Sequence, residues 1–502
     1  MAENYINEGH WDFSGGVNQS VSRLLMADNE LEIVQNGELE KVGSISKVRG
    51  YTQRGSDVNT GYDILGAVYG YKPSDGTQKQ IVIADGAANS DAYTYNPITG
   101  AWTIHNLSLT TGAKAEFEYF LDGFFMVNFE DATRWNDLTQ WYTTTNVTNA
   151  AKAKYIKLYK SRIYLAYVVS GGSTYPSKIT YSDLPSSGTI AWDDSVNYFD
   201  VEEEDGDVIR GLEVNADRLL IFKENSLHRY DTNTRYKVPG CPGTVSQRSV
   251  KNIQGWTLYL HHTGLWGYDG SSSTLLSRRI KDIIDGVSTK NLVNACAYVK
   301  GDHYYLYLGD IINSAKGLEI DKCLLDYDIA KNAFTWRSLE KTPTVFEKYP
   351  DDRTNVTYDL ATVSYNDSDV AYGGLISSEE RMYFGATDGA VYQVDTGRDY
   401  DGTDIPFFVE TKNYYLGQPS FYKMLQKVQI YVNSGKGIQV QYKLDDKDWR
   451  TLGRVGDTQS ELIFKAASRC KRVKFRFSEA SSGGRFSIEG LDIFFTPETL
   501  IA

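Results

Sequence analysis

The chain has 502 residues, of which 23% are charged and 13% aromatic, and its formal net charge is −13. A chain of this length can bury a large core and suggests two to four domains, and its composition is that of an ordered globular protein. The negative charge argues against a protein that holds nucleic acid by neutralising phosphates, although DNA could still pass through a pore.

Membrane insertion is not expected from the apolar segments. No apolar run approaches the roughly 20 residues that a spanning helix needs. The N-terminal sequence MAENYINEGHWDF has neither the basic start nor the apolar stretch of a signal peptide. Four cysteines without metal-binding spacing are expected to be buried thiols in a reducing compartment: Cys241, Cys296, Cys323 and Cys470. The sequence therefore predicts a soluble protein made in the cytosol.

Residues 1–60 form a less regular N-terminal region. Asp28 is placed to cap a short helix over 29–36, and Gly43 permits a turn into a strand. The region ends in the phrase SISKVRGYTQRG. We expect an arm with one short helix and a strand, ahead of the domains that follow.

A strand–turn–strand phrase recurs through 61–395. ERMYFGATDGAVYQVD at 380–395 is a typical copy, with two short alternating runs joined by Asp388-Gly389. Six earlier copies occupy 80–96, 122–137, 161–183, 216–231, 255–270 and 301–328. Other strand-like segments lie between the copies, so each unit can supply about four antiparallel strands, as in a propeller blade. The sequence thus predicts an all-β protein with a β-propeller of about seven blades (six to eight).

The composition changes after Asp395. Residues 396–405 are polar and rich in Gly and Asp, as in a linker. About six strand-like segments follow in 406–502, which predicts a C-terminal β-sandwich. Within the propeller region, a short helix is expected near 276–286, and the segment 340–358 is a candidate gating loop between blades.

Catalytic signatures are not found in the sequence, which has no G-x-S-x-G, H-E-x-x-H, P-loop or C-x-x-C. We therefore expect no enzyme activity, no catalytic residues and no cofactor. The best candidate for a metal site is an acidic run beside a glycine, which could bind Ca²⁺: Glu202, Glu203, Glu204, Asp205 and Asp207. A solvated loop between strands explains the same run without a metal.

A basic stripe is expected along the strand RCKRVKFRF at 469–477. Alternation places its basic side chains on one face and its apolar side chains on the other: Arg472, Lys474 and Arg476 against Val473, Phe475 and Phe477. The apolar set belongs to the sandwich core. The basic set is either a solvated face or an interface with an acidic neighbouring subunit.

The segment DFSGGVNQSVSRLLMADNELEIVQNGELEKVGSISKVRGY at 12–51 resembles the opening of tail nozzle or tail hub proteins of short-tailed bacteriophages, also called DNA-stabilisation proteins. The matching pattern has five parts: Asp12 to Gly16, Asp28 to Glu30, Asn36, Gly43 to Ile45, and Arg49 to Tyr51. In that family a propeller and then a small β-domain follow, which is the order expected here.

The resemblance implies a structural virion protein of the tail, assembled in the host cytoplasm as a homo-oligomeric ring of six copies. Such a ring would extend the DNA channel below the portal and adaptor proteins, help to retain and release the genome, and anchor tail fibres or spikes. Double-stranded DNA would pass through it without sequence-specific binding. No catalytic residues carry over from this family.

Two other interpretations stay open. A glycan-binding or glycan-cleaving propeller with a carbohydrate-binding sandwich would use paired carboxylates such as Glu203 and Asp205. Its stacking platforms would be tryptophans on strands, whose default role is packing between blades: Trp256, Trp266 and Trp336. The third interpretation is a scaffold propeller that binds a peptide or protein on one face.

Overall fold

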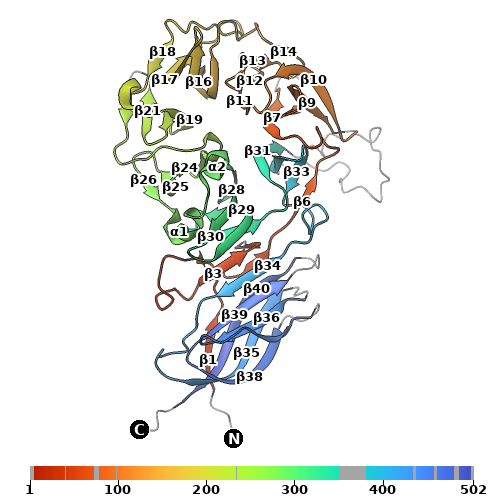
Figure 1. Ribbon diagram of the computed structural model, residues 1–502, viewed down its shortest axis with the longest axis vertical. Coiled ribbons are helices and arrows are strands. Elements are labelled where there is room, and N and C mark those ends of the chain that lie inside the picture. The colour runs from red at the N-terminus through yellow and green to blue at the C-terminus, as the bar shows by residue number, and fades with distance from the viewer. Residues whose placement is uncertain are drawn as a thin grey trace.

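The computed structural model describes residues 5–39, 41–72, 78–97, 99–232, 234–350, 380–433, 437–456, 461–479 and 485–498. Strands contain 55% of the residues and helices 5%. Figure 1 looks along the axis of a ring of four-stranded units, with a second all-β domain attached at the rim. The protein is therefore an all-β chain that combines a propeller with a sandwich, as the sequence predicted.

In the described part of the chain, the propeller has seven blades of four antiparallel strands. Blade 1 contains β7 (Ile64–Tyr71), β8 (Gln78–Ala84), β9 (Ser90–Asn96) and β10 (Ala101–Leu109). Blade 2 contains β11 (Glu116–Phe120), β12 (Gly123–Val127), β13 (Arg134–Asn136) and β14 (Trp141–Tyr142). Blade 3 contains β15 (Lys152–Tyr159), β16 (Arg162–Ser170), β17 (Ser173–Tyr181) and β18 (Tyr198–Asp200). Blade 4 contains β19 (Ile209–Asn215), β20 (Arg218–Lys223), β21 (Leu227–Asp231) and β22 (Thr234–Lys237).

The remaining blades follow the same plan. Blade 5 contains β23 (Lys251–Ile253), β24 (Trp256–His261), β25 (Gly264–Tyr268) and β26 (Ser273–Leu275). Blade 6 contains β27 (Cys296–Lys300), β28 (His303–Asn313), β29 (Leu318–Asp328) and β30 (Ala333–Ser338). Blade 7 contains β31 (Pro343–Pro350), β32 (Glu380–Ala386), β33 (Val391–Val394) and the N-terminal strand β6 (Tyr51–Gln53).

Each repeated phrase of the sequence forms the second and third strands of one blade. These strands are buried on both faces because neighbouring blades pack face to face, which explains apolar runs such as GFFMV in β12. In the last copy, the turn at Asp388-Gly389 joins β32 to β33, and Gly389 has φ +85°, which favours glycine. Seven copies therefore give seven blades, and the predicted propeller is confirmed.

The ring closes through its side chains and through one strand. Clusters of buried apolar residues fill the successive gaps between blades, and Ile64, Val82, Val345 and Tyr383 fill the gap between blades 7 and 1. Strand β6 comes from the N-terminal region, yet it pairs with β33 as the outer strand of blade 7. Blade 7 therefore contains strands from both ends of the propeller sequence, and their pairing closes the ring.

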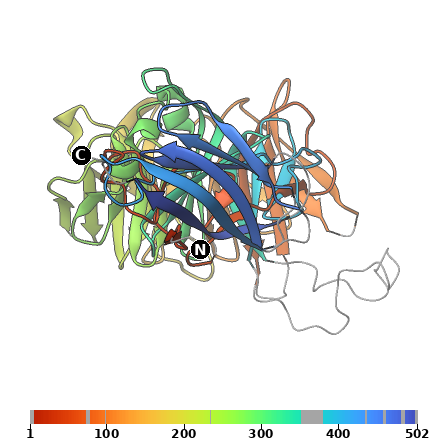
Figure 2. The same cartoon turned by 90° about the horizontal axis from the view of Figure 1, so that it is seen from below.

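The sandwich has two sheets, and residues before 50 contribute to both. One sheet contains β38 (Glu461–Cys470), β35 (Lys423–Asn433), β40 (Ser487–Pro497), β1 (Ile6–His10), β5 (Ile45–Lys47) and β4 (Gly37–Glu38). The other contains β2 (Gly16–Val17), β3 (Glu30–Gln35), β34 (Phe407–Thr411), β39 (Val473–Glu479), β36 (Gln439–Leu444) and β37 (Arg450–Arg454). Figure 2, from the sandwich end, shows these C-terminal strands in blue in front of the ring. The strands β1 to β5 are therefore part of the sandwich rather than of a separate arm.

One sheet runs from blade 6 into the sandwich. Strand β3 pairs with β30 of blade 6 through Gln35 and Trp336, and on its other side with β34. The segment 396–405, expected as a linker, is packed as well, because Tyr400 is buried and stacks on Tyr51 with ring centroids 4.8 Å apart. The propeller and the sandwich are thus joined by a continuous sheet and by a packed connection.

One local prediction is wrong, and a second is wrong for the part of its range that the structure describes. Residues 29–36 do not form a helix, because Leu31 and Val34 are fully buried in strand β3, which is paired on both sides; tertiary pairing overrides local helix preference here. The candidate gating loop 340–358 contains β31, whose side chains line the propeller axis. Residues 351–358 lie outside the described part of the chain.

The expected helix near 276–286 is confirmed as a 3₁₀ turn, η3 (Ser277–Ile280), followed by α1 (Lys281–Ile284). A second short helix, α2 (Thr289–Asn294), precedes blade 6. No helix among the described residues is long and apolar enough to cross a membrane. All four cysteines are buried free thiols, as predicted.

Candidate functional site

One arginine crosses the propeller axis. Arg248, in the 3₁₀ helix η2 (Gln247–Ser249) before blade 5, is 8% exposed. Its guanidinium donates to the carbonyl oxygens of Leu65 (2.6 Å), Ala115 (3.0 Å) and Thr344 (2.9 Å), which belong to blades 1, 2 and 7. It also pairs with Glu116 at 2.8 Å. Arg248 therefore ties blade 5 to the blades across the axis and occupies the centre of the ring.

The rest of the axial cavity, about 280 Å³, is lined by charged groups of both signs. Lys157 of β15 lies 3.1 Å from Glu213 of β19 and 3.6 Å from Glu118 of β11, which links three neighbouring blades. Glu347 of β31 also lines the cavity, and burial raises the pKa of its carboxyl group to about 7. Charged side chains of opposite sign therefore surround the axis of the propeller, and Arg248 crosses it.

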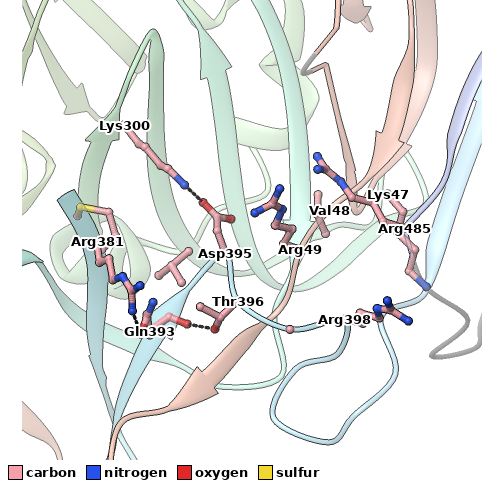
Figure 3. Close-up of a pocket in the computed structure, with 13 residues that line it drawn as sticks. Lys47, Val48, Arg49, Lys300, Arg381, Gln393, Asp395, Thr396, Arg398 and Arg485 are labelled. Carbon is pink, nitrogen blue, oxygen red and sulfur yellow. Dashed lines mark hydrogen bonds and ion pairs between the residues drawn. The ribbon is translucent and has the colours of Figure 1, made fainter. Parts of the chain in front are cut away.

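A second cavity, of about 760 Å³, lies at the junction of the two domains (Figure 3). We call it the junction cleft. It is formed by β5 and the residues after it, by the end of β27, by β32 and β33, and by the start of the connection to the sandwich. Its charged lining comprises six cations and one carboxylate: Lys47, Arg49, Lys300, Arg381, Arg398, Arg485 and Asp395. In a chain of net charge −13, this is a local excess of positive charge.

The single carboxylate of the cleft is already paired. Asp395 accepts from Arg337 at 2.8 Å and from Lys300 at 2.6 Å. Burial alone would raise the pKa of Asp395, but Arg337 and Lys300 lower it to about 2. Arg337 is 3% exposed and also contacts Glu38 at 3.3 Å. Asp395 is therefore ionised at neutral pH and belongs to a buried network behind the cleft.

Two further cations of the cleft have carboxylate partners, Arg381 donates to the Gln393 side chain at 3.5 Å, and the remaining two have no carboxylate partner among the described residues. Lys47 pairs with the buried Glu479, and Arg485 pairs with Glu38. Arg49 and Arg398 are exposed, and within the described part of the chain no carboxylate lies within 4.0 Å of either guanidinium. These two arginines give the cleft its unbalanced positive charge.

Arg49 and Arg398 lie on two segments whose backbones touch. A Cβ atom added to Gly50 would lie 1.6 Å from the carbonyl oxygen of Asp399, so no larger residue fits there. The Tyr51 amide donates to the same oxygen at 3.2 Å, and the Thr396 amide donates to the Gly50 carbonyl at 3.1 Å. The phrase Arg49-Gly50-Tyr51 thus has a structural explanation that its sequence did not reveal.

Asn36, another part of the sequence pattern at 12–51, fixes the same junction. It is fully buried with φ +55°, and its amide group donates to the Pro406 carbonyl at 2.6 Å. Its side-chain oxygen accepts from the Ser338 amide at 2.9 Å and from the Tyr400 hydroxyl at 3.1 Å. One side chain therefore joins the N-terminal strands, blade 6 and the connection to the sandwich.

The acidic run forms a loop around a lysine rather than a metal site. The Lys223 ammonium is fully buried and donates to the carbonyls of Val201 (2.9 Å) and Glu202 (3.0 Å) and to Asp205 (2.5 Å). Burial alone would raise the pKa of Asp205, but the hydrogen bond from Lys223 lowers it.

The other acids of the run are also accounted for. Glu202 pairs with Lys237 at 2.9 Å, Asp207 accepts from the amides of Glu224 and Asn225, and Glu203 and Glu204 are exposed. No cluster of metal-ligating side chains occurs among the residues that the structure describes. The lysine thus supplies internally the positive charge that a metal would bring.

The basic stripe is satisfied within the sandwich. Lys474 contacts both Glu410 and Glu32, and Arg476 pairs with Glu410 and stacks over Trp449 with its guanidinium carbon 4.1 Å from the ring. Arg472 pairs with the exposed Asp446 at 2.5 Å. The apolar side of the strand is in the core, as predicted. An interface role for Arg472, Lys474 and Arg476 stays a prediction.

The tryptophans considered for sugar stacking lie in or beside blade cores. Trp336 is 1% exposed, Trp256 packs against the core of blades 5 and 6, and Trp266 packs against that of blades 4 and 5. The sequence could not reveal Arg248 or the junction cleft, because their partners lie far apart in the chain, up to 447 positions for Arg485 and Glu38. The only signal was the closeness of Lys47 and Arg49, which are two positions apart in the sequence.

No family model and no curated protein matches this sequence. Solved structures with a similar arrangement include "YCF48 bound to D1 peptide", with 9% sequence identity and a TM-score of 0.38, covering 71% of this chain and 97% of that one. The extracellular domain of the putative one-component system BT4673 from B. thetaiotaomicron has 11% identity and a TM-score of 0.41, covering 88% of this chain and 58% of that one. BamB from Moraxella catarrhalis has 12% identity and a TM-score of 0.35, covering 78% and 98%. These similarities concern the fold, and the chain itself is a seven-bladed β-propeller joined to a β-sandwich.

Proposed function

We propose that this chain is a structural subunit of the tail nozzle or hub of a short-tailed bacteriophage. Copies would form a homo-oligomeric ring around the channel for double-stranded DNA, with six copies as the resemblance of residues 12–51 implies. The ring would contact the portal and adaptor proteins and carry tail fibres or spikes. The protein would act through its shape and its contacts, not as an enzyme.

The observation that carries this proposal is an exposed apolar loop at 18–29, here called the docking loop. It projects beside β3 at the side of the molecule (Figure 1). Val21 is 39% exposed, Leu24 64% and Leu25 77%. Three large apolar side chains within five residues of one loop are typical of a protein contact surface. The docking loop lies inside the segment that resembles the tail proteins.

The docking loop is held in a fixed shape. Glu30 is 7% exposed and accepts from the Asn18 side chain at 2.8 Å and from the Ala27 amide at 3.0 Å, which ties the two ends of the loop together. The Gln19 amide donates to the Arg279 carbonyl at 2.8 Å, which anchors the loop on η3. A loop that is ordered before it binds loses less conformational entropy in forming an interface.

The way in which the two domains are joined also supports a role as part of the wall of a ring. The continuous sheet through β30, β3 and β34 and the packed connection at Tyr400 make one extended unit of the two domains. Because Arg248 crosses the propeller axis, DNA would pass through the lumen of the ring and not through the propeller itself.

The test compares the oligomeric state of docking-loop variants by mass photometry. Wild-type protein should form rings, and the double variant Leu24→Ser with Leu25→Ser should shift the population toward monomers by about tenfold or more, since two exposed leucines lose contact area worth a few kcal/mol per interface. The matched control, Leu184→Ser with Val196→Ser, changes two exposed apolar residues of blade 3 that are 55% and 70% exposed.

Rings from the docking-loop variant in the same yield as wild type would contradict the role of this loop. A wild-type protein that stays monomeric at every concentration would contradict the ring itself. Polysaccharide cleavage that is lost in Glu203→Gln would favour the glycan-cleaving alternative.

A further inference from the structure

The junction cleft has the features of an anion site. Its six lysine and arginine side chains come from four separate parts of the chain and meet around one cavity (Figure 3). The only carboxylate in the lining, Asp395, is held by Arg337 and Lys300. Lys47 and Arg485 are matched by Glu479 and Glu38. Among the described residues, no carboxylate balances the positive charges of Arg49 and Arg398.

Backbone contacts fix the two segments that carry these arginines. Gly50 fits against Asp399 so closely that the segments carrying Arg49 and Arg398 stay side by side. Two hydrogen bonds, from Tyr51 to Asp399 and from Thr396 to Gly50, hold the same contact. Both arginines line the cleft from segments whose backbones are held together, so the main chain needs little reorganisation when an anion binds.

We propose that the junction cleft binds phosphate groups. Guanidinium groups present planar pairs of N–H donors that match phosphate oxygens, and several in one cavity favour a ligand with more than one negative charge. The volume of about 760 Å³ is that of a small-molecule site. The apolar lining consists of Val48, Met382 and Val394, with no aromatic ring on which a base could stack. The cleft therefore recognises the phosphates of its ligand rather than a base.

Phosphate groups of this kind come either from a compact oligophosphate or from the backbone of a nucleic acid. Both ligands would offer the cleft the same phosphate contacts. They differ in size, and this difference allows the experiment to distinguish them. This binding does not depend on ring formation, because every lining residue belongs to one copy of the chain.

The test measures binding of tripolyphosphate to the wild-type protein by calorimetry at low salt. Arg49→Gln with Arg398→Gln should weaken binding at least about tenfold for each arginine, because hydrogen bonds between charged groups are among the strongest in proteins. Both side chains are exposed, so the thermal unfolding midpoint without ligand should stay that of wild type. Arg49→Lys with Arg398→Lys keeps the charge but loses the paired donors, and should bind with intermediate affinity.

The matched control is Arg278→Gln with Arg450→Gln, which removes two exposed arginines outside the cleft. Equal loss of binding in this control, or tripolyphosphate binding by the Arg49 and Arg398 double variant that equals wild type, would overturn the proposal. So would a wild-type protein that does not bind tripolyphosphate. If a 12-base-pair DNA duplex displaces tripolyphosphate, the nucleic-acid backbone is a source of the phosphates. If the duplex does not displace it, the ligand is a compact oligophosphate. Either result supports a phosphate site.

Discussion

The propeller and the domain junction are held together in different ways. In the propeller, each strand pairs with the strand before or after it in the chain, and apolar clusters fill the gaps between blades. Among the described strands of the propeller, only β6 comes from far away in the sequence. At the junction, charged and polar groups from distant parts of the chain meet in buried pairs, such as Lys47 with Glu479, 432 positions apart.

This difference indicates which kind of contact determines the structure of each region. Apolar burial is non-directional, so a propeller built on it tolerates changes that keep volume and pattern. Buried ion pairs and hydrogen bonds act only at defined geometry, and removing one partner leaves the other buried without compensation. We therefore expect the junction to determine how the sandwich is placed on the ring, and the apolar clusters to determine that the ring forms.

The largest expected effect comes from breaking the junction network with Arg337→Met. Asp395 would keep only Lys300, and Glu38 only Arg485. Loss of one partner from a buried ionic network costs about 3–5 kcal/mol. The free energy of unfolding in urea should fall by that amount, and the single transition should divide into separate steps for propeller and sandwich. Arg278→Met is the surface control and should change stability by less than about 0.5 kcal/mol; an equal effect in that control would contradict the role of the network.

The matching change in the propeller is Arg248→Met, which removes the only described side chain that bonds across the axis to blades 1, 2 and 7. Three carbonyl oxygens lose a charged donor, while Glu116 is 25% exposed and can be solvated. We expect a loss of about 2–3 kcal/mol in the free energy of unfolding. Unlike Arg337→Met, this variant should still unfold in one transition. A divided transition would mean that the axis, and not the junction, couples the domains.

The same comparison explains how much the sequence could predict. The blades were predictable because each repeated phrase contains its own pairing partners and its own turn, as in the hairpin around Asp388-Gly389. The helix near 276–286 was predictable because its pattern is local too. In both cases the neighbours in space are also neighbours in sequence.

The junction was not predictable for the opposite reason. Residues 30–35 have ordinary helix-compatible composition, and only pairing with β30 and β34 makes them a strand. The lysine that replaces a metal at the acidic run, Lys223, lies 16 or more positions after those acids. Arg49 and Gly50 stood out in the sequence as part of a phrase, but their contact with Asp399 depends on a fold of almost 350 intervening residues. A single sequence does not specify which distant segments meet.

The smallest expected effect concerns Glu347, one of the carboxylates at the axis, whose pH dependence has the opposite sign to that of the junction carboxylate Asp395. Burial raises the pKa of Glu347 to about 7, whereas an unfolded chain releases this proton near pH 4.3. Its contribution to stability is therefore complete below about pH 4 and is lost as the pH rises through 7. Asp395 at the junction behaves in the opposite way, because its lowered pKa gives stability above about pH 4 that is lost toward pH 2.

Glu347→Gln should remove the part of the pH dependence of stability that comes from Glu347. The full shift from about 4.3 to about 7 corresponds to about 4 kcal/mol, which we reduce to about 2 kcal/mol because the side chain is only partly buried. The variant should match wild type in urea unfolding at pH 4 and exceed its stability by about 2 kcal/mol at pH 8. Glu319→Gln, at an exposed position of blade 6, should show no such trend. A difference between Glu347→Gln and wild type that stays constant from pH 4 to pH 8 would mean that the axis holds this carboxylate ionised, as the junction holds Asp395.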